Sequence, residues 1–307
     1  MTARLRIGTR GSPLARVQTA LVCRALEAAH PELAASGVLE VVAIRTTGDR
    51  VVDRPLAELG GKGLFCKEIE TALLAGRIDL AVHSMKDLPT WLPDGLVIGA
   101  VLPRGDPRDV LIARAPTTIA ELPEGALIGT ASVRRRAQLL ARRPDLRVAD
   151  FRGNVETRLG KLAAGEVDAA VLALAGLERL GIEPAGAVVL APEVMLPAVG
   201  QGAIGIECRA SDASARTLLA AIDDPASSAC LRAERALLAA LDGSCHTPIA
   251  GHAELDGGRL RLRALIARPD GSECLRAARR GAIADAEALG RDAGHELRAR
   301  SGPEFFD

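Results

Sequence analysis

Short apolar segments typical of β-strands alternate with helical segments through the first two thirds of the chain, and this alternation constrains the fold most. Leu5 to Arg10 is the first expected strand, and Ser12 and Pro13 supply an N-cap and a first-turn proline for a helix running towards His30. The later expected elements are the strands Leu39 to Arg45, Asp79 to Ser84 and Leu96 to Leu102, and a helix from about Phe65 to Ala75. Alternating strands and helices predict an α/β fold with a mainly parallel sheet.

The same pattern starts again after the turn-rich segment Pro103 to Pro107. Ile7-Gly8-Thr9 recurs as Ile128-Gly129-Thr130, and the run Ala75 to Val82 (AGRIDLAV) recurs as Ala164 to Val171 (AGEVDAAV). Chance similarity between helix–strand junctions is the alternative explanation. A duplication predicts two α/β lobes, with small anionic ligands between them at the carboxyl ends of the strands.

The pattern changes from about Asp223. A helix through Ala233 to Leu238 is followed by the strand-like Arg259 to Ile266 and by an amphipathic segment from about Ala284 to Arg300. These elements predict a third, smaller α+β domain.

Composition excludes several classes of function. The 39 Lys and Arg residues balance the 39 Asp and Glu residues, so no net charge points to nucleic acid or a membrane surface, and any anion site is local. Aromatic residues make up 2% of the chain and Tyr is absent, which excludes a base-stacking surface. The lack of a recognisable signal peptide or membrane span predicts a cytoplasmic protein. The six cysteines form no C-x-x-C pair, so neither a zinc site nor a disulfide framework is expected.

Hydroxyl and arginine side chains gather at both repeated strand-to-helix junctions. They are Thr9, Arg10 and Ser12 at the first junction, and Thr130, Ser132, Arg134 and Arg135 at the second. Free N–H groups, the helix dipole and guanidinium groups together bind carboxylates or phosphates. Simple N-caps beside solvated arginines are the alternative. With the additional arginines Arg152, Arg158 and Arg179, the pattern fits a substrate with several carboxylates.

Two further segments carry charged groups that can act on a ligand. Lys62 lies in the glycine-rich Gly60 to Phe65, which lacks Walker A spacing and fits a loop that closes over a ligand. Lys86 and Asp87 follow an expected strand end, where a carboxylate can hold a protonated amine and stabilise a neighbouring carbocation. A surface Lys-Asp pair is the alternative there.

Cys245 differs from the other cysteines because it lies in a turn sequence, Asp242 to Pro248. A thiolate on such a loop can reach a cleft as a nucleophile. A Cys-His dyad with His246 is less favoured, because adjacent side chains rarely point the same way.

Together these segments closely resemble the porphobilinogen deaminase family over nearly the whole chain. The matching segments are Arg6 to Ala15, Gly60 to Phe65, Val82 to Asp87, Gly129 to Arg135, Arg152 to Asn154, Ala175 to Leu177 with Arg179, Gly200 to Ala203, and the Cys245 loop. Their order and spacing make the resemblance specific. Two departures stand out: Ala131 replaces a second Ser that is common in the family, and Gly243-Ser244 replaces a Gly-Gly.

The resemblance implies an architecture of two lobes like type II periplasmic binding proteins and a small C-terminal α+β domain that carries the cysteine. The implied domains are residues 1–102 with 200–221 (lobe 1), 103–199 (lobe 2) and 222–307. The chain would re-enter lobe 1 through about Gly202 to Arg209.

The resemblance also implies hydroxymethylbilane synthase activity. Four porphobilinogen molecules would be joined head to tail, with loss of ammonia, to a dipyrromethane cofactor attached to Cys245 through a thioether, and water would release hydroxymethylbilane. Asp87 would contact pyrrole N–H groups and stabilise the azafulvenium-like electrophile, with Lys62 and Phe65 as further catalytic residues. The implied cofactor-binding residues are Cys245, Ser84, Lys86, Asp87, Thr130, Ser132, Arg134, Arg135, Arg152, Gly153 and Arg158. The implied substrate-binding residues are Arg10, Ser12, Arg152, Arg158 and Arg179.

Two other functions remain open at this point. One is a carboxylate-binding receptor or transcriptional effector domain on the same two-lobed fold, which gives Cys245 no role. The other is a nucleic-acid binder that uses Arg134 to Arg136 with Arg142 and Arg143, which has neither a basic surplus nor aromatic residues to support it. The expected partner is therefore porphobilinogen alone, with no metal, nucleic acid or membrane, and the expected state is a monomer.

Overall fold

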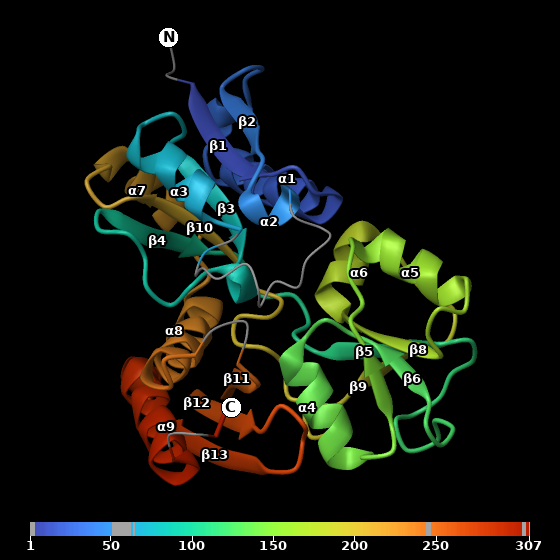
Figure 1. Cartoon of the computed structure of the whole chain (residues 1–307). Coiled ribbons are helices and arrows are strands. Elements are labelled where there is room, and N and C mark those ends of the chain that lie inside the picture. Colours follow the sequence, from blue (N-terminus) through green and yellow to red (C-terminus); the bar gives the residue numbers. More distant parts are fainter. Residues whose placement is uncertain (1–3, 51–62, 64, 244–246, 303–304, 307) are drawn as a thin grey trace. The chain divides into compact units, whose positions relative to one another are not determined.

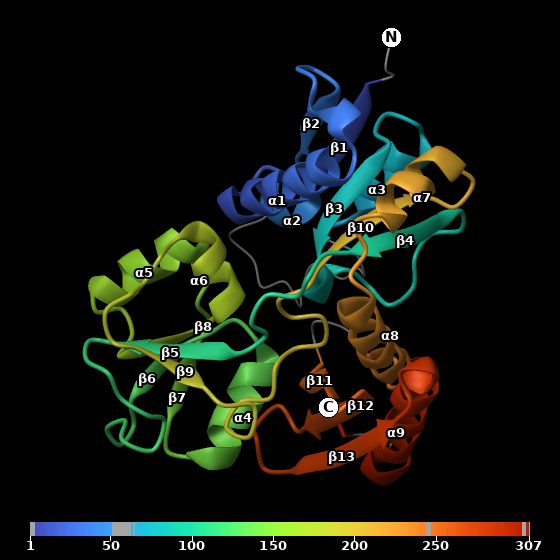
Figure 2. The ribbon, with the colours of Figure 1, turned by 180° about the vertical axis from the view of Figure 1, so that it is seen from behind.

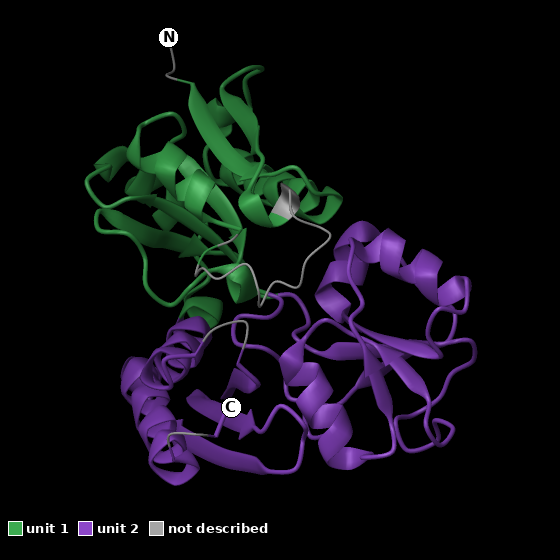
Figure 3. Cartoon of the chain, in the orientation of Figure 1, with its two compact units in different colours: residues 1–104, 203–228 green, residues 105–202, 229–307 purple. Residues whose placement is uncertain are grey.

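The computed structural model describes residues 4–50, 63, 65–243, 247–302 and 305–306. The chain divides into two compact units, Met1–Arg104 with Ala203–Ser228 and Gly105–Gly202 with Ala229–Asp307 (Figure 3). Two expected site residues, Lys62 and Cys245, lie outside the described residues. The division into three domains stays a prediction.

The first unit is built around a five-stranded sheet with the order β2-β1-β3-β10-β4 (Figure 1). Its strands are β1 (Leu5–Arg10), β2 (Leu39–Ile44), β3 (Leu80–Ser84), β4 (Leu96–Val101) and β10 (Ile204–Arg209). β1 is parallel to β2 and β3, whereas β10 is antiparallel to β3 and β4. β4 therefore has the same direction as the first three strands, which confirms a mainly parallel sheet.

Helices cover both faces of this sheet, which Figures 1 and 2 show from opposite sides. α1 (Pro13–Ala29) and α7 (Ala213–Ala220) share a core with one face, through Leu26 and Leu219. α3 (Lys67–Leu74) packs on the other face through Ile69 and Leu73. Among the described residues of this unit, the short helical elements are η1 (Pro31–Ala34), α2 (Thr47–Arg50) and η3 (Met85–Asp87).

The second unit contains a sheet of the same design, with the order β7-β6-β8-β5-β9. Its strands are β5 (Asp109–Ala113), β6 (Leu127–Gly129), β7 (Arg147–Ala149), β8 (Ala169–Ala173) and β9 (Ala187–Leu190). β5 takes the place of β10 and is antiparallel to both of its neighbours, β8 and β9. α4 (Val133–Arg142) packs on one face of the sheet, and α5 (Val155–Ala163) and α6 (Leu174–Leu180) pack on the other.

One pair of aspartates makes the repeat visible at atomic detail. The Asp79 N–H donates to Arg6 O (2.8 Å), and Asp79 Oδ2 accepts from the Arg6 N–H (2.9 Å). In the second sheet, the Asp168 N–H donates to Leu127 O (2.8 Å), and Asp168 Oδ2 accepts from the Leu127 N–H (2.7 Å). The segments that echo each other in sequence therefore occupy equivalent positions in the two sheets.

The second unit also holds a three-stranded antiparallel sheet, made of β11 (Ile249–Asp256), β12 (Arg259–Ala267) and β13 (Cys274–Gly281). α8 (Pro225–Ala240) and α9 (Ala286–Ser301), preceded by η4 (Ile283–Asp285), share its core. The two helices approach closely at Gly290, where a Cβ would lie 2.1 Å from Ala233 O. Ala137 of α4 packs with Ala250 and Leu265, which joins this sheet to the rest of the unit.

The predicted α/β class with a small C-terminal α+β part is thus confirmed. The predicted strands and helices agree with the observed ones to within one or two residues at most ends, because their signals are local. None of the helices in the described residues is long and apolar enough to cross a membrane.

Candidate functional site

In each α/β sheet, the site residues expected from the sequence gather at the carboxyl edge of the parallel strands. In the first unit, Arg10 and Ser12 follow β1, and Ser84, Lys86 and Asp87 follow β3. In the second unit, Thr130 to Arg135 follow β6, Arg152 and Gly153 follow β7, and Arg179 lies on α6 directly after β8. This edge is where α/β folds bind their ligands.

A pocket opens at this edge of the first unit. Its lining residues are Arg10, Ser12, Leu14, Ala15, Gln18, Phe65, Cys66, Val82, His83, Ser84 and Asp87. The Arg10 guanidinium lies 4.2 Å from the centre of the Phe65 ring, a cation–π contact. Gly48 makes room for this ring, because a Cβ there would lie 2.2 Å from Phe65. The pocket thus combines a cation, an aromatic face and an exposed carboxylate, Asp87.

The hydroxyl groups of this pocket also have structural partners. Ser12 is the N-cap of α1, and its Oγ accepts a hydrogen bond from the Ala15 N–H (3.3 Å). Ser84 Oγ donates to Gln18 Oε1 (2.9 Å), and Gln18 is itself buried. These contacts fix the side chains that any ligand in the pocket would meet.

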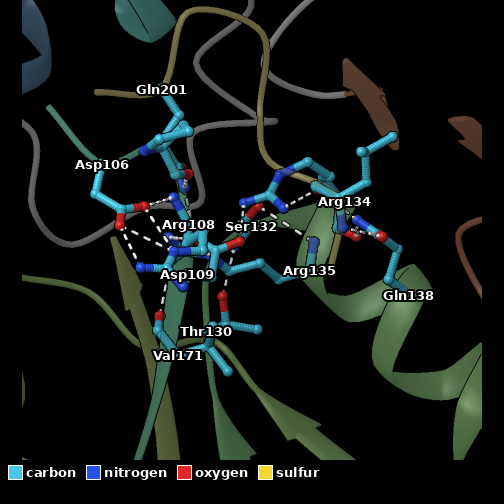
Figure 4. A network of polar contacts seen from close by, with 12 residues as sticks. Asp106, Arg108, Asp109, Thr130, Ser132, Arg134, Arg135, Gln138, Val171 and Gln201 are labelled. Carbon is cyan, nitrogen blue, oxygen red and sulfur yellow. Dashed lines mark hydrogen bonds and ion pairs between the residues drawn. The ribbon is translucent and has the colours of Figure 1, made fainter. Parts of the chain in front are cut away.

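In the second unit, Arg134 and Arg135 are buried around one carboxylate, Asp109 (Figure 4). Arg134 Nη2 lies 2.9 Å from Asp109 Oδ2, and Arg135 Nη2 donates to Asp109 Oδ1 (2.7 Å). Gln201 Nε2 donates to the same Oδ1 (2.8 Å). The alternative of solvated arginines beside a simple N-cap is therefore wrong, although Ser132 does cap α4.

Other N–H groups of the same two arginines donate hydrogen bonds to backbone carbonyl groups. Arg134 Nη1 donates to Leu196 O (2.6 Å), and Arg135 Nη1 donates to Val171 O (2.8 Å). Arg134 Nε is buried and has no hydrogen-bond partner among the residues that the structure describes. The guanidinium groups are therefore held rigidly, with one buried donor left over.

The charge balance of this cluster is positive, because two arginines share one carboxylate. Burial alone would raise the pKa of Asp109, but the charges of Arg134 and Arg135 outweigh it and lower the pKa to about 2. Burial also lowers the pKa of Arg134, which Asp109 opposes. A buried excess of positive charge and an open N–H group fit an added carboxylate.

We expect Asp109→Asn to destabilise the protein by about 3–5 kcal/mol, because it leaves two buried arginines without their anion. The carboxylate contributes stability above about pH 4, and this contribution is lost as the pH falls towards 2. The stability difference between the wild type and Asp109→Asn should therefore shrink in acid. Denaturant unfolding at several pH values measures it, and Asp106→Asn, which loses a partly exposed pair with Arg108, is the control. Equal unfolding free energies for the two variants would contradict the assignment.

Three other arginines expected in the site, Arg152, Arg158 and Arg179, also donate hydrogen bonds to the protein itself. Arg152 Nε donates to Asp150 Oδ2 (2.9 Å), and Arg158 Nε donates to Asn154 O (3.4 Å). Arg179 Nη2 donates to Gly202 O (2.5 Å), and burial lowers the pKa of Arg179. Gly153, with φ of +117°, has the left-handed conformation that allows the turn into α5.

Four of the five arginines of the nucleic-acid alternative are engaged within the protein. Arg134 and Arg135 are buried, Arg142 donates to the carbonyl groups of Glu193 and Val194, and Arg143 pairs with Asp145 at 2.7 Å. These four groups are engaged with the protein itself, which leaves Arg136, an exposed residue of α4, as the remaining arginine of this alternative.

Sequence analysis missed several polar residues of these sites. They are Asp109 and Gln201 in the arginine cluster, and Gln18 in the pocket of the first unit. A weak signal for Asp109 was present, since a carboxylate that opens the apolar run DVLIA needs a buried partner.

Comparison with known proteins identifies, over nearly the whole chain, the family that the sequence motifs resemble. Residues 5–217 match the family described as "Porphobilinogen deaminase, dipyromethane cofactor binding domain", and residues 228–299 match "Porphobilinogen deaminase, C-terminal domain". The chain is 57% identical to a porphobilinogen deaminase of Paracoccus denitrificans over 99% of this chain and 96% of that protein. It is 54% identical to one of Nitrobacter winogradskyi over 98% and 94% of the two chains. It is 51% identical to a chloroplastic porphobilinogen deaminase of Oryza sativa over 99% of this chain and 86% of that protein.

A solved structure of a periplasmic substrate-binding protein of an ABC transporter from Coxiella burnetii is similar at 16% identity and a TM-score of 0.43, over 73% of this chain and 94% of that chain. The two family matches and the identities above one half, which extend over almost every residue, decide the relationship. The chain belongs to the porphobilinogen deaminase family.

Proposed function

We propose that this chain carries out the reaction of its family with the residues at the carboxyl edges of its two α/β sheets. The chain is a transferase of tetrapyrrole biosynthesis that joins four porphobilinogen molecules head to tail on a covalent dipyrromethane cofactor. Ammonia is lost at each addition, and water releases hydroxymethylbilane. When bound, the dipyrromethane supplies the pyrrole ring on which growth starts, and we assign its thioether bond to Cys245.

The observation that carries the assignment of site residues is the buried cluster in which Arg134 and Arg135 share Asp109. Each pyrrole unit brings two carboxylates, so a chain of zero net charge must concentrate cations where those units bind. The open Nε of Arg134 and the excess positive charge fit one such carboxylate. We assign to the cofactor the residues Ser84, Lys86, Asp87, Thr130, Ser132, Arg134, Arg135, Arg152, Gly153 and Arg158.

Asp87 is the group that we assign to the chemical step. Its carboxylate is exposed at the end of η3 and lines the same pocket as Arg10 and Phe65. There it can accept hydrogen bonds from pyrrole N–H groups and oppose the positive charge that develops on porphobilinogen as ammonia leaves. Phe65 provides an apolar face beside it, and Lys62 is assigned to the carboxylates of the reacting rings.

We assign Arg10, Ser12 and Arg179, together with Arg152 and Arg158, to the carboxylates of incoming porphobilinogen and of the growing chain. Arg10 and Ser12 support this role because they line the pocket that holds Asp87. Three domains with the bounds given above, a monomeric state and a cytoplasmic location remain parts of the proposal.

Two arginine variants test how the carboxylate contacts are divided. We expect Arg135→Leu to yield mainly cofactor-free protein, and Arg179→Leu to yield cofactor-loaded protein that stalls with partly extended chains. Each loses a charge-assisted contact that is typically worth about 1.5–3 kcal/mol. Intact-mass spectra after brief exposure to porphobilinogen measure both effects.

Arg135 also pairs with Asp109, so the experiment needs a control for folding. Arg136→Leu changes the next residue of α4, which is exposed, and should show the wild-type set of masses. Thermal unfolding identifies any Arg135→Leu protein that is simply unfolded. Identical sets of adduct masses in folded Arg135→Leu and Arg179→Leu would rule out the division of roles.

A further inference from the structure

Four titratable side chains are buried together on the α3 face of the first sheet. They are Cys66, Glu70, His83 and Glu207, with 2%, 6%, 7% and 0% of their surfaces exposed. Cys66 immediately precedes α3 and Glu70 lies within it, while His83 is on β3 and Glu207 on β10. The function proposed above gives none of them a role.

The strand register brings His83 and Glu207 together. His83 is opposite Gly205 and Ala81 is opposite Glu207 in the antiparallel pair of β3 and β10, so both side chains leave the sheet on the same face. His83 Nε2 lies 3.0 Å from Glu207 Oε2. The other carboxylate oxygen of Glu207, Oε1, is buried without a hydrogen-bond partner among the described residues. One proton acceptor of the pair therefore remains open.

Burial disfavours negative charge in this cluster. Two carboxyl groups lie in the interior beside one imidazole, and an unpaired buried negative charge is costly. Burial raises the pKa of Glu70, and the charge of Glu207 adds to this, while the Cys66 hydrogen bond and His83 oppose it. Burial also raises the pKa of the Cys66 thiol, with Glu70 contributing. Burial therefore disfavours the charged forms of Glu70 and Cys66, whereas His83 and Glu207 face each other at hydrogen-bond distance.

The cluster opens on the pocket that contains Asp87, because His83 and Cys66 are both among its lining residues. The charged and titratable groups around His83 are Glu207 of β10, Glu70 and Cys66 on the α3 side, and Arg10 and Asp87 in the pocket. His83 is therefore placed between a buried carboxylate and the volume that the substrate would enter.

We propose that His83, held by Glu207, is the group that exchanges a proton with the substrate pocket, an inference that rests on the proposed function. At each addition the C–N bond of the aminomethyl group breaks and its electron pair leaves with nitrogen. A C–C bond forms to a ring carbon, and that carbon loses one proton. The departing ammonia takes up one proton, so protons balance. His83 accepts the proton from carbon and returns it to ammonia, while Asp87 opposes the positive charge.

Replacing His83 tests this directly. We expect His83→Gln, which retains a polar contact for Glu207, to lower turnover by about 10²–10⁴-fold while the cofactor stays attached. Intact mass and thermal unfolding are the readouts besides turnover. His30→Gln is the matched control, because His30 is a partly buried histidine of the same unit that lies outside the pocket, with Nε2 3.0 Å from Leu218 O, and it should retain wild-type turnover.

Glu207→Gln provides a second test that separates proton exchange from folding. Without the carboxylate of Glu207, the His83 ring loses the partner that orients it, so kcat should fall by about tenfold while KM for porphobilinogen and the attached cofactor stay as in the wild type. A folded, cofactor-loaded His83→Gln protein with wild-type turnover would overturn the inference, as would a Glu207→Gln protein with the wild-type kcat. Either of these results would leave the proposed function standing as long as the wild type consumes porphobilinogen. A wild type that does not consume porphobilinogen would refute the proposed function itself.

Discussion

Cys245→Ser is expected to yield a folded protein that carries no cofactor and forms no hydroxymethylbilane. A Ser hydroxyl is neutral at physiological pH and is a far weaker nucleophile than a thiolate, so no covalent bond forms to the dipyrromethane. Intact mass should match the sequence without an adduct, and porphobilinogen consumption should fall to background.

The other cysteines supply the controls for this experiment. Burial raises the pKa of Cys23, Cys66, Cys208 and Cys274, which keeps these four as unreactive thiols. Cys230 is buried as well. Cys23→Ser and Cys230→Ser should therefore retain the adduct and nearly all of the turnover. A Cys245→Ser protein that still carries the adduct and turns over normally would refute the attachment site.

Asp87→Asn is expected to lower turnover by about two to three orders of magnitude with little loss of bound cofactor. The substitution keeps the size of the side chain but removes the negative charge that opposes the developing cation. The cofactor stays attached because its thioether and its arginine contacts are unchanged. Steady-state kinetics together with intact mass distinguish the two effects.

Asp94→Asn is the matched control for charge, since Asp94 is an exposed aspartate that lies outside the pocket. It should behave like the wild type in both measurements. If Asp87→Asn kept most of its turnover, the electrostatic role assigned to Asp87 would be wrong. If it instead lost the cofactor, the contact of Asp87 with the cofactor would be its main role, and its role in the chemical step would be unsupported.

The fold could be predicted from the sequence wherever the signal is local. The repeated Ile-Gly-Thr lies at β1 and β6, and the repeated Ala-Gly segments lead into β3 and β8. Caps such as Ser12 and Ser132 depend on residues three positions away, so their sequence pattern was sufficient. The places of β5 and β10 next to β8 and β3 depend on the crossover connections, and alternation of strands and helices does not encode them.

The candidate site could be predicted only in part, for the same physical reason. Arg134 and Arg135 were identified from a helix start, but their partner Asp109 comes from a different strand, 26 residues before Arg135. His83 and Glu207 are 124 residues apart in sequence and meet only because β10 pairs with β3. Partners of this kind require the register of the sheet, which local sequence patterns do not supply.

Intact mass of the wild-type protein, measured before and after brief exposure to porphobilinogen, tests whether the product grows covalently on Cys245. Before exposure, we expect a mass above that of the sequence by one dipyrromethane group, carried on the peptide that contains Cys245. After exposure, we expect a series of heavier species that differ by one porphobilinogen minus ammonia, and a return to the starting mass when the substrate is exhausted. A single mass equal to that of the sequence, unchanged by porphobilinogen, would refute covalent growth on this chain.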